Sequence, residues 1–191
     1  ETIDSEVTAL HCDDGGFVVR HDDHELRARH VILATGCEDV VPDLDGIEAA
    51  VECGAVRMCP ICDAFEAIDT TIAVHGPADK AAPHAQFLRT YSPKVTLVPS
   101  TAEVPDEVRA ELERDGIELT SVPDSLAFDG KRCVFELDGR PRSFDVMYPM
   151  LGIISRSSLA VGAGAQCDDG GALVVDRHQK TPVAGLNGPG I

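Results

Sequence analysis

The amino-acid sequence predicts an α/β protein with two related domains, and two patterns carry this prediction. The first is a repeat: strands, a hairpin and an apolar strand ending at glycine occur near residues 6–36 and again near residues 125–152. The second is an alternation of strands and helices across residues 71–122, between the two copies, which is typical of a parallel sheet with right-handed crossovers. Low identity between the copies leaves chance similarity as the alternative to a true repeat.

Each copy of the repeat predicts short strands separated by polar or glycine turns. These strands are expected at residues 6–11, 17–20 and 25–29 in the first copy, and at residues 125–128, 133–137 and 140–143 in the second. Continuous apolar runs follow at residues 30–34 and 146–151 and stop at Gly36 and Gly152. Runs without alternation are typical of parallel strands that are buried on both faces.

The segment between the copies predicts three strands, at residues 71–74, 94–98 and 117–122, and two helices. The helix at 81–90 has a small apolar face, and the helix at 105–115 has a proline at its start, acids in its first turn and Gly116 after its end. Beyond the second copy, residues 172–176 predict a strand and residues 181–186 an extended segment.

Composition excludes several classes of partner. The net charge is −17, which disfavours nucleic acid and anionic membranes, and no apolar run approaches the roughly 20 residues of a membrane helix. Salt-rich surroundings or biased codon usage both account for the acidity. Seven cysteines in an odd, scattered pattern are unlike a secreted disulfide scaffold, so we expect a reducing cytoplasm.

Cys59 and Cys62 are separated by two residues and form the most distinctive motif of the chain. A helix that begins at the first cysteine would bring the pair together and favour the thiolate form at its N-terminus. The motif therefore predicts a redox dithiol. A zinc site, which would need Cys53 and a distant histidine, and a pair of ordinary cysteines are the alternatives.

The motif and three other segments resemble the thioredoxin reductase-like members of the class II pyridine nucleotide-disulfide oxidoreductases. Cys59 to Glu66 resembles the Cys-x-x-Cys-Asp-Gly-Phe/Tyr motif of that family. The other matching segments, in the order in which that family has them, are residues 31–36, 145–152 and 181–186.

The resemblance implies two Rossmann-like domains of three-layer ββα character, each with a hairpin or meander insertion. Residues 1–50 and 151–191 would form a discontinuous FAD-binding domain, and residues 51–150 an NAD(P)-binding-like domain that carries the dithiol. The family's first Gly-x-Gly-x-x-Gly loop and the Gly-Asp that follows its last segment have no counterpart in the sequence. We therefore expect an incomplete chain with a truncated flavin domain that binds FAD weakly or not at all.

The resemblance also implies roles for individual residues. Cys62 would face the flavin, Cys59 would attack the partner disulfide, and Asp63 would be the acid–base group, with a helix-capping carboxylate as its alternative. Ala34, Thr35 and Gly36 would pass close to FAD, and the alternative for the last two is a simple turn after the strand.

The nicotinamide site departs from the family pattern. Gly76 and Ala78 occupy the glycine positions of the second nucleotide loop, but Pro77 removes a backbone donor and Asp79 adds a negative charge. Residues 99–101, Pro-Ser-Thr, lack the cations that a 2′-phosphate requires. We therefore expect weak NADPH binding, with NADH or a ferredoxin as other donors. His75, His84 and Lys80 are possible ligand contacts or ordinary structural and solvated residues.

The function implied is electron transfer from FAD through Cys59 and Cys62 to the disulfide of a thioredoxin-like protein, by a cytoplasmic homodimer without a membrane or nucleic-acid partner. Two alternatives remain: an oxygen-dependent dithiol oxidase, which often lacks a nicotinamide domain, and a non-catalytic redox-sensing domain of the same fold.

Overall fold

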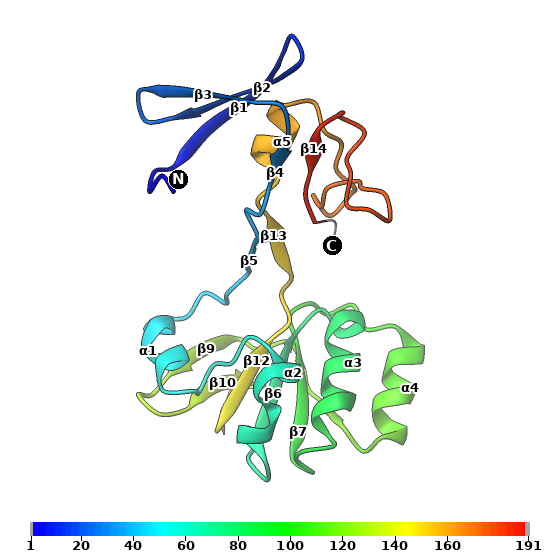
Figure 1. Ribbon diagram of the computed structural model, residues 1–191. Coiled ribbons are helices and arrows are strands. Elements are labelled where there is room, and N and C mark those ends of the chain that lie inside the picture. The colour runs from blue at the N-terminus through cyan, green and yellow to red at the C-terminus, as the bar shows by residue number, and fades with distance from the viewer. Residues whose placement is uncertain (1, 190–191) are drawn as a thin grey trace. The chain divides into compact units, whose positions relative to one another are not determined.

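The computed structural model describes residues 2–189, which fold as two units (Figure 1). Unit 1 consists of residues up to Glu38 together with the segment from Ile153 onward, and unit 2 is Asp39–Gly152. One unit is therefore discontinuous in sequence and the other continuous. The assignment of FAD to unit 1 and NAD(P) to unit 2 stays a prediction.

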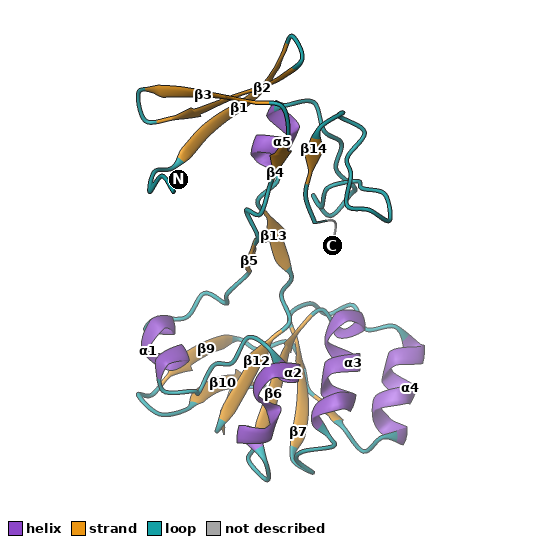
Figure 2. Ribbon diagram, viewed as in Figure 1, coloured by secondary structure: helices purple, strands orange, loops and turns teal. Residues whose placement is uncertain are grey.

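Unit 2 is built on a four-stranded parallel sheet with strand order β12-β6-β7-β8. The strands are Val146–Pro149 (β12), Ile72–Gly76 (β6), Val95–Pro99 (β7) and Glu118–Leu119 (β8). Two helices, α3 (Ala78–Leu88) and α4 (Asp106–Arg114), connect β6 to β7 and β7 to β8, and they pack side by side (Figure 2). This arrangement is the parallel α/β unit that the alternating pattern predicts.

Side chains alternate between the two faces of this sheet, because successive strand residues point to opposite sides. Ile72 and Val74 of β6 pack against the alanine-rich face of α3, whereas Ala73 between them packs on the other side. A three-stranded antiparallel meander covers that second side with Phe135 and Phe144. Its strands are Ser125–Phe128 (β9), Cys133–Leu137 (β10) and Arg140–Phe144 (β11). The result is the predicted layering of helices, parallel sheet and meander.

Unit 1 repeats the meander but has a much smaller parallel sheet. Its antiparallel strands are Val7–Asp13 (β1), Gly16–His21 (β2) and His24–Ala28 (β3). The following strand, Val31–Ile32 (β4), pairs in parallel with Leu186–Asn187 (β14). A core around Leu10, Phe17 and Leu33 joins these strands to the short helix Ser158–Gly162 (α5). Both copies of the sequence repeat are therefore present as meander followed by parallel strand.

The structure corrects several details of the sequence prediction. Residues 172–176 form no strand; Leu173 makes an isolated bridge to Cys167, and the segment turns at Asp176, whose carboxylate accepts the amides of His178 and Lys180. The apolar run at 30–34 pairs over two residues only. Three short elements have no periodic signal long enough to predict them: Cys37–Asp39 (β5), Ile47–Glu52 (α1) and Ile153–Ser155 (β13).

The predicted domain boundary at residue 50 lies inside unit 2. Helix α1 belongs to that unit because Ala50 is fully buried and, with Leu44, packs into the core beneath the meander. The chain passes between the units instead at β5 and β13, which pair with each other.

Candidate active site

The Cys59–Cys62 pair forms a disulfide in a tight turn of unit 2, with 5.3 Å between the Cα atoms. A short helix, α2 (Pro60–Asp63), starts directly after Cys59, and Pro60 suits its first position because no intrahelical donor is needed there. Residues three apart in a helical turn lie on the same side, so the turn brings the two sulfur atoms together. Cys59 is half-buried and Cys62 is exposed.

Helix α2 stabilises a thiolate less than the sequence pattern predicts. Helix α2 has only four residues, so its dipole is small. The amides of Cys62 and Asp63 donate to the Cys59 carbonyl at 3.0 and 3.3 Å, and Pro60 has no N–H. A short 3₁₀ turn, Ala64–Ala67, continues the chain beyond Asp63. Groups outside the helix therefore matter more for the charge state of the pair.

A network of charged and polar groups lies beside the disulfide turn. Tyr148 of β12 donates its hydroxyl hydrogen bond to Asp63 Oδ1 at 2.9 Å, and Arg57 Nη1 donates to Asp63 Oδ2 at 3.3 Å. Arg57 Nη2 also contacts Glu66 Oε2 at 2.8 Å. Asp63 therefore accepts hydrogen bonds at both carboxylate oxygens and does not cap the helix through its side chain.

The surroundings of the network perturb two of its members. Burial, together with the hydrogen bond to Asp63, raises the pKa of Tyr148 well above its usual range, so the phenol stays a neutral donor. Burial of Arg57 works toward a lower pKa, but its contacts with Glu66 and Asp63 outweigh that effect and raise the pKa of the guanidinium. Arg57 and Tyr148 thus remain in their donor forms across the physiological range.

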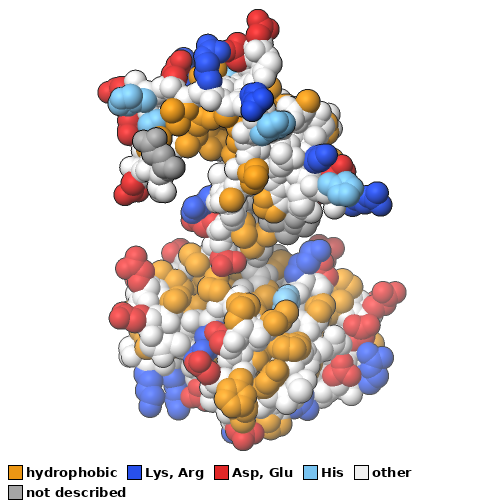
Figure 3. Space-filling view, viewed as in Figure 1, with side chains coloured by type: hydrophobic (Ala, Val, Ile, Leu, Met, Phe, Trp, Pro, Cys, Tyr) orange, Lys and Arg blue, Asp and Glu red, His pale blue; other side chains and the backbone are white. Residues whose placement is uncertain are grey.

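Apolar side chains surround the disulfide on the surface of unit 2. Ile61 lies between the two cysteines and is 82% exposed, and Phe65 just beyond Asp63 is 75% exposed. Ile68 adds a third exposed apolar side chain, and Figure 3 shows hydrophobic side chains gathered over this part of unit 2. Exposed large apolar residues grouped around a reactive centre are typical of a surface that contacts a partner.

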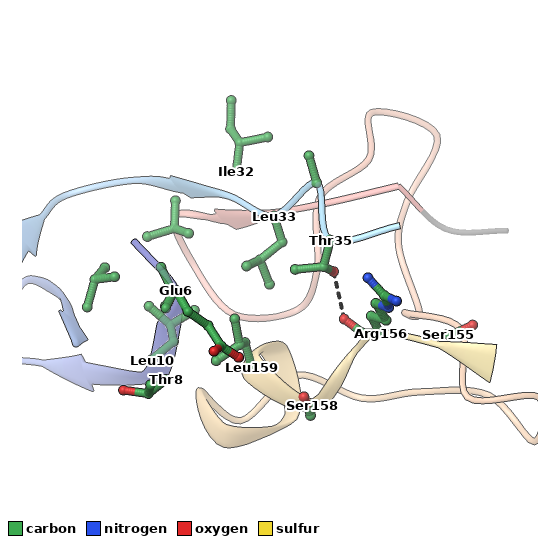
Figure 4. Close-up of a pocket in the computed structure, with 14 residues that line it drawn as sticks. Glu6, Thr8, Leu10, Ile32, Leu33, Thr35, Ser155, Arg156, Ser158 and Leu159 are labelled. Carbon is green, nitrogen blue, oxygen red and sulfur yellow. Dashed lines mark hydrogen bonds between the residues drawn. The ribbon is translucent and has the colours of Figure 1, made fainter. Parts of the chain in front are cut away.

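The residues predicted to contact FAD line open space in unit 1. Ala34 and Thr35 border a cavity of about 880 Å³ that is otherwise largely apolar, with Glu6 and Arg156 at its polar edge (Figure 4). Thr35 Oγ1 donates to the Arg156 carbonyl at 2.6 Å, which fixes the bend after β4. A cavity of this size and lining is within the usual range for small-molecule and cofactor sites.

Gly36 borders a second, smaller cavity of about 230 Å³ that shares Leu33 and Thr35 with the first. Its φ of +70° is a left-handed conformation that favours glycine, while the space around its α-carbon is open. The structure therefore places Ala34, Thr35 and Gly36 beside open space at one edge of unit 1, and their contact with FAD stays a prediction.

The second nucleotide loop is shaped by packing within the chain. A Cβ atom added at Gly76 would lie 2.3 Å from the Met150 carbonyl oxygen, so β12 requires a glycine there whether or not a ligand binds. Ala78 is 1% exposed and belongs to the core between the sheet and α3. Neither position presents a side chain to a ligand.

The charges near this loop do not match a phosphate ligand. Asp79 lies in the first turn of α3, where an anion would otherwise be favoured, and Lys80 Nζ is 3.8 Å from its carboxylate. Ser100 follows β7, and its amide donates to the Gly76 carbonyl at 2.9 Å. The first turn of α3 therefore carries a carboxylate, and its one lysine lies beside that carboxylate.

His75 is buried at the end of β6. Its Nδ1 lies 2.9 Å from the Val98 carbonyl oxygen, and its ring packs against Phe135. Burial lowers its pKa, and the contact with Val98 only partly offsets that effect. His75 also borders a cavity of about 340 Å³ with Ser100 and Leu151.

The other cysteines are free thiols, namely Cys12, Cys37, Cys53, Cys133 and Cys167. Burial raises the pKa of Cys133 to about 12, so that thiol is inert at neutral pH. Within residues 2–189, no group of three or more metal-ligating side chains is placed to hold an ion, and no helix has the length and apolarity to cross a bilayer.

The sequence analysis missed Arg57 and Tyr148 as parts of this site. Arg57 precedes the motif by two residues, and Tyr148 lies on a strand far along the chain. No spacing rule connects the two, since the parallel bridge between Val56 and Met147 of β12 is what brings Tyr148 near the dithiol. An ionisable hydroxyl inside an otherwise apolar strand is the one signal that could have marked it.

Comparison with known proteins places these features in a family context. The family described as pyridine nucleotide-disulphide oxidoreductase matches residues 2–186. A dihydrolipoyl dehydrogenase from Acholeplasma laidlawii is 25% identical over 128 residues, which is 63% of this chain and 38% of that protein.

Solved structures share the fold over almost the whole chain. HlmI matches with a TM-score of 0.83 and 25% identity, covering 98% of this chain and 61% of its own. The thioredoxin reductase of T. acidophilum matches with a TM-score of 0.68 and 21% identity, covering 97% and 64%. The atypical thioredoxin reductase TRi of Desulfovibrio vulgaris Hildenborough matches with 0.52 and 27%, covering 97% and 64%. The chain thus spans less than two thirds of the length of these proteins.

Proposed function

This chain belongs to the pyridine nucleotide-disulphide oxidoreductase family, and we propose that it is the dithiol-bearing part of a flavin-dependent enzyme that reduces the disulfide of a thioredoxin-like protein. The observation that carries the proposal is the Cys59–Cys62 disulfide, held in a surface turn with exposed apolar side chains around it. Similarity to proteins described as thioredoxin reductases supports the choice of partner.

The proposed flavin site is the open cavity beside Ala34 and Thr35 in unit 1, next to the smaller cavity that Gly36 borders. A bound flavin would supply two electrons that convert the disulfide to two thiols. The departures of the loop at Gly76 and Ala78 from the family pattern support weak binding of a dinucleotide, so we derive no step from a nicotinamide there. NADPH, NADH and a reduced ferredoxin remain candidate electron donors.

The reduced pair then acts by thiol–disulfide exchange. The Cys59 thiolate attacks one sulfur of the partner disulfide, forming a mixed disulfide and releasing the other partner sulfur as a thiolate. The Cys62 thiolate attacks the Cys59 sulfur, which closes the Cys59–Cys62 bond and releases the second partner thiolate. Asp63 takes the proton of the attacking thiol and returns it to a departing thiolate. Two electrons pass from the pair to the partner, and the thiol protons balance.

The proposal extends to the setting of the enzyme. Five free cysteines beside a single disulfide suit a reducing cytoplasm. A homodimer is the assembly that the family resemblance implies.

The assignment of the two cysteines can be tested by disulfide trapping. The probe is a thioredoxin variant that keeps only its attacking cysteine, activated as a mixed disulfide with thionitrobenzoate, and the readout is release of the coloured leaving group. We expect the reduced Cys62→Ser variant to react at least about tenfold faster than Cys59→Ser, because the attacking thiol is Cys59.

Cys53→Ser is the matched control, since Cys53 is an exposed free thiol of the same unit, and it should leave the rate of the otherwise intact pair unchanged. Faster reaction of Cys59→Ser would reverse the assigned roles. Failure of both variants, with oxygen consumption on a small dithiol by the wild type, would replace the proposal with the dithiol oxidase.

A further inference from the structure

The Asp63 carboxylate is held from two sides by residues of different elements. Tyr148 donates to Oδ1 at 2.9 Å, and Arg57 donates to Oδ2 at 3.3 Å. Both oxygens therefore have a partner, and the carboxylate is fixed in one orientation at the end of α2. Asp63 directly follows Cys62, and adjacent residues of a helix do not face each other. The two hydrogen bonds therefore determine the orientation of the Asp63 carboxylate.

Both holders are anchored on strand β12. The Tyr148 side chain is fully buried among Ile72, Val74 and the helices that cover them. Arg57 donates its backbone N–H to the Met147 carbonyl at 2.9 Å, on the same strand. The α-carbon of Gly54 leaves room for the guanidinium, because an added Cβ would lie 3.0 Å from Arg57 Nη2.

The charges around the carboxylate are few and defined. Arg57 stands between Asp63 and Glu66, and its side chain is only 17% exposed, so its pairing with Asp63 is shielded from solvent. Arg57, Tyr148 and Glu66 are the groups that contact this carboxylate or its ion-pair partner. The disulfide-trapping assay does not test these contacts with Asp63, so the role of the hydrogen-bonded network has to be inferred separately.

We propose that Tyr148 and Arg57 are positioning residues for the Cys59–Cys62 pair, which hold the Asp63 carboxylate in one orientation so that it can exchange protons with the thiols. This inference rests on the proposed function, in which Asp63 is the acid–base group. Tyr148 is the sharper test, because replacing it with phenylalanine removes one hydrogen bond without changing any charge.

The experiment follows reduction of the disulfide by dithiothreitol in the 191-residue chain as a function of pH. Tyr148→Phe should change the pH profile of the rate, because the carboxylate is then no longer held beside the thiols, and Asp63→Asn should change the profile at least as much. The double variant should match Asp63→Asn, because Tyr148 acts only through Asp63.

Tyr91→Phe is the matched control. It alters the only other tyrosine of the chain, which is half-buried in unit 2 against Phe87, and should leave the pH profile unchanged. Carboxyl ¹³C shifts of Asp63 in the folded protein give the same information independently of rate. Arg57→Lys should keep more of the wild-type profile than Arg57→Met, since lysine retains the charge but not the forked geometry.

Coincident profiles for the wild type and Tyr148→Phe would overturn the positioning role, even if the variant unfolds at a lower temperature. A further shift in the double variant would also overturn it, because Tyr148 would then act through another group. If dithiothreitol fails to reduce the wild-type pair at any pH, the proposed function itself fails, and the two results are thereby distinguished.

Discussion

At the scale of single residues, the dithiol site depends on where polar side chains find partners. Asp63 illustrates this: its place after Cys62 is plain from the sequence, but its hydrogen bonds to Tyr148 and Arg57 depend on β12. Gly76 shows the opposite case. Its place resembles that of a nucleotide-loop glycine, but a glycine is required there because a side chain would collide with the backbone of Met150. Residue identity alone therefore does not separate a ligand contact from a packing constraint.

His75 gives a prediction about pH at this scale. Its folded-state pKa is lowered by burial, so the unfolded chain binds the additional proton as the pH falls below about 6.5. The free energy of unfolding of unit 2 should therefore fall as the pH drops below about 6.5. Above that pH, His75 should not affect it. The slope from one such group approaches about 1.4 kcal/mol per pH unit at most.

The measurement is urea unfolding of the wild type and of His75→Gln between about pH 5 and pH 7. The variant should be less sensitive to acid in that window, although its absolute stability can be lower. His11→Gln is the control, because His11 is exposed. Equal acid sensitivity of His75→Gln and the wild type would contradict the prediction.

At the scale of elements, sequence patterns succeeded where local rules decide the structure. Strands β9 and β10 match their predicted bounds, and the helix after Val104 differs by one residue at each end, because turns, proline and glycine mark these ends directly. The prediction of a strand at residues 172–176 was wrong, because an apolar β-branched segment forms a strand only where the edge of a sheet is free to pair with it. Helices α1 and α5 are too short for a periodic signal.

Helix α3 spans Ala78–Leu88 instead of the predicted residues 81–90, so Pro83 lies in its interior and not in its first turn. A proline at this interior position removes a hydrogen bond and crowds the carbonyl of Asp79, four residues before it. Alanine burial along the opposite face, at Ala81, Ala82 and Ala85, outweighs this cost. Tertiary packing, rather than local propensity, therefore defines the helix.

Pro83→Ala should consequently stabilise unit 2. Proline costs up to about 3 kcal/mol relative to alanine inside a helix, and the greater freedom of the unfolded alanine chain offsets part of that gain. We expect a net gain of about 1–2 kcal/mol, measured by urea unfolding. Pro105→Ala is the control, since Pro105 precedes α4 with a non-helical ψ of 141° and should give no gain. A loss of stability in Pro83→Ala would show that the proline is required by packing.

At the scale of the whole molecule, the two units differ in how completely their sheets are covered. Unit 2 has helices on one face of a four-stranded parallel sheet and a meander on the other, so that β6 and β7 are buried at every residue. In unit 1 the parallel sheet consists of β4 and β14, and Ile32 in β4 is 79% exposed. The sequence predicts both the repeat and a truncated first domain, but it does not predict how many strands pair in each copy.

The smaller and more exposed parallel sheet of unit 1 predicts that the two units unfold separately. Regions with few buried apolar contacts open at lower free energy, so amides of β4 and β14 should exchange with solvent much faster than those of β6 and β7. Hydrogen–deuterium exchange followed by mass spectrometry should therefore show exchange in unit 1 at urea concentrations where β6, β7 and β12 remain protected. A flavin that binds beside Thr35 should slow exchange in unit 1 alone, since a ligand stabilises only the state that binds it. Equal protection of β4 and β6 in the ligand-free chain would show instead that the two units unfold as one cooperative body.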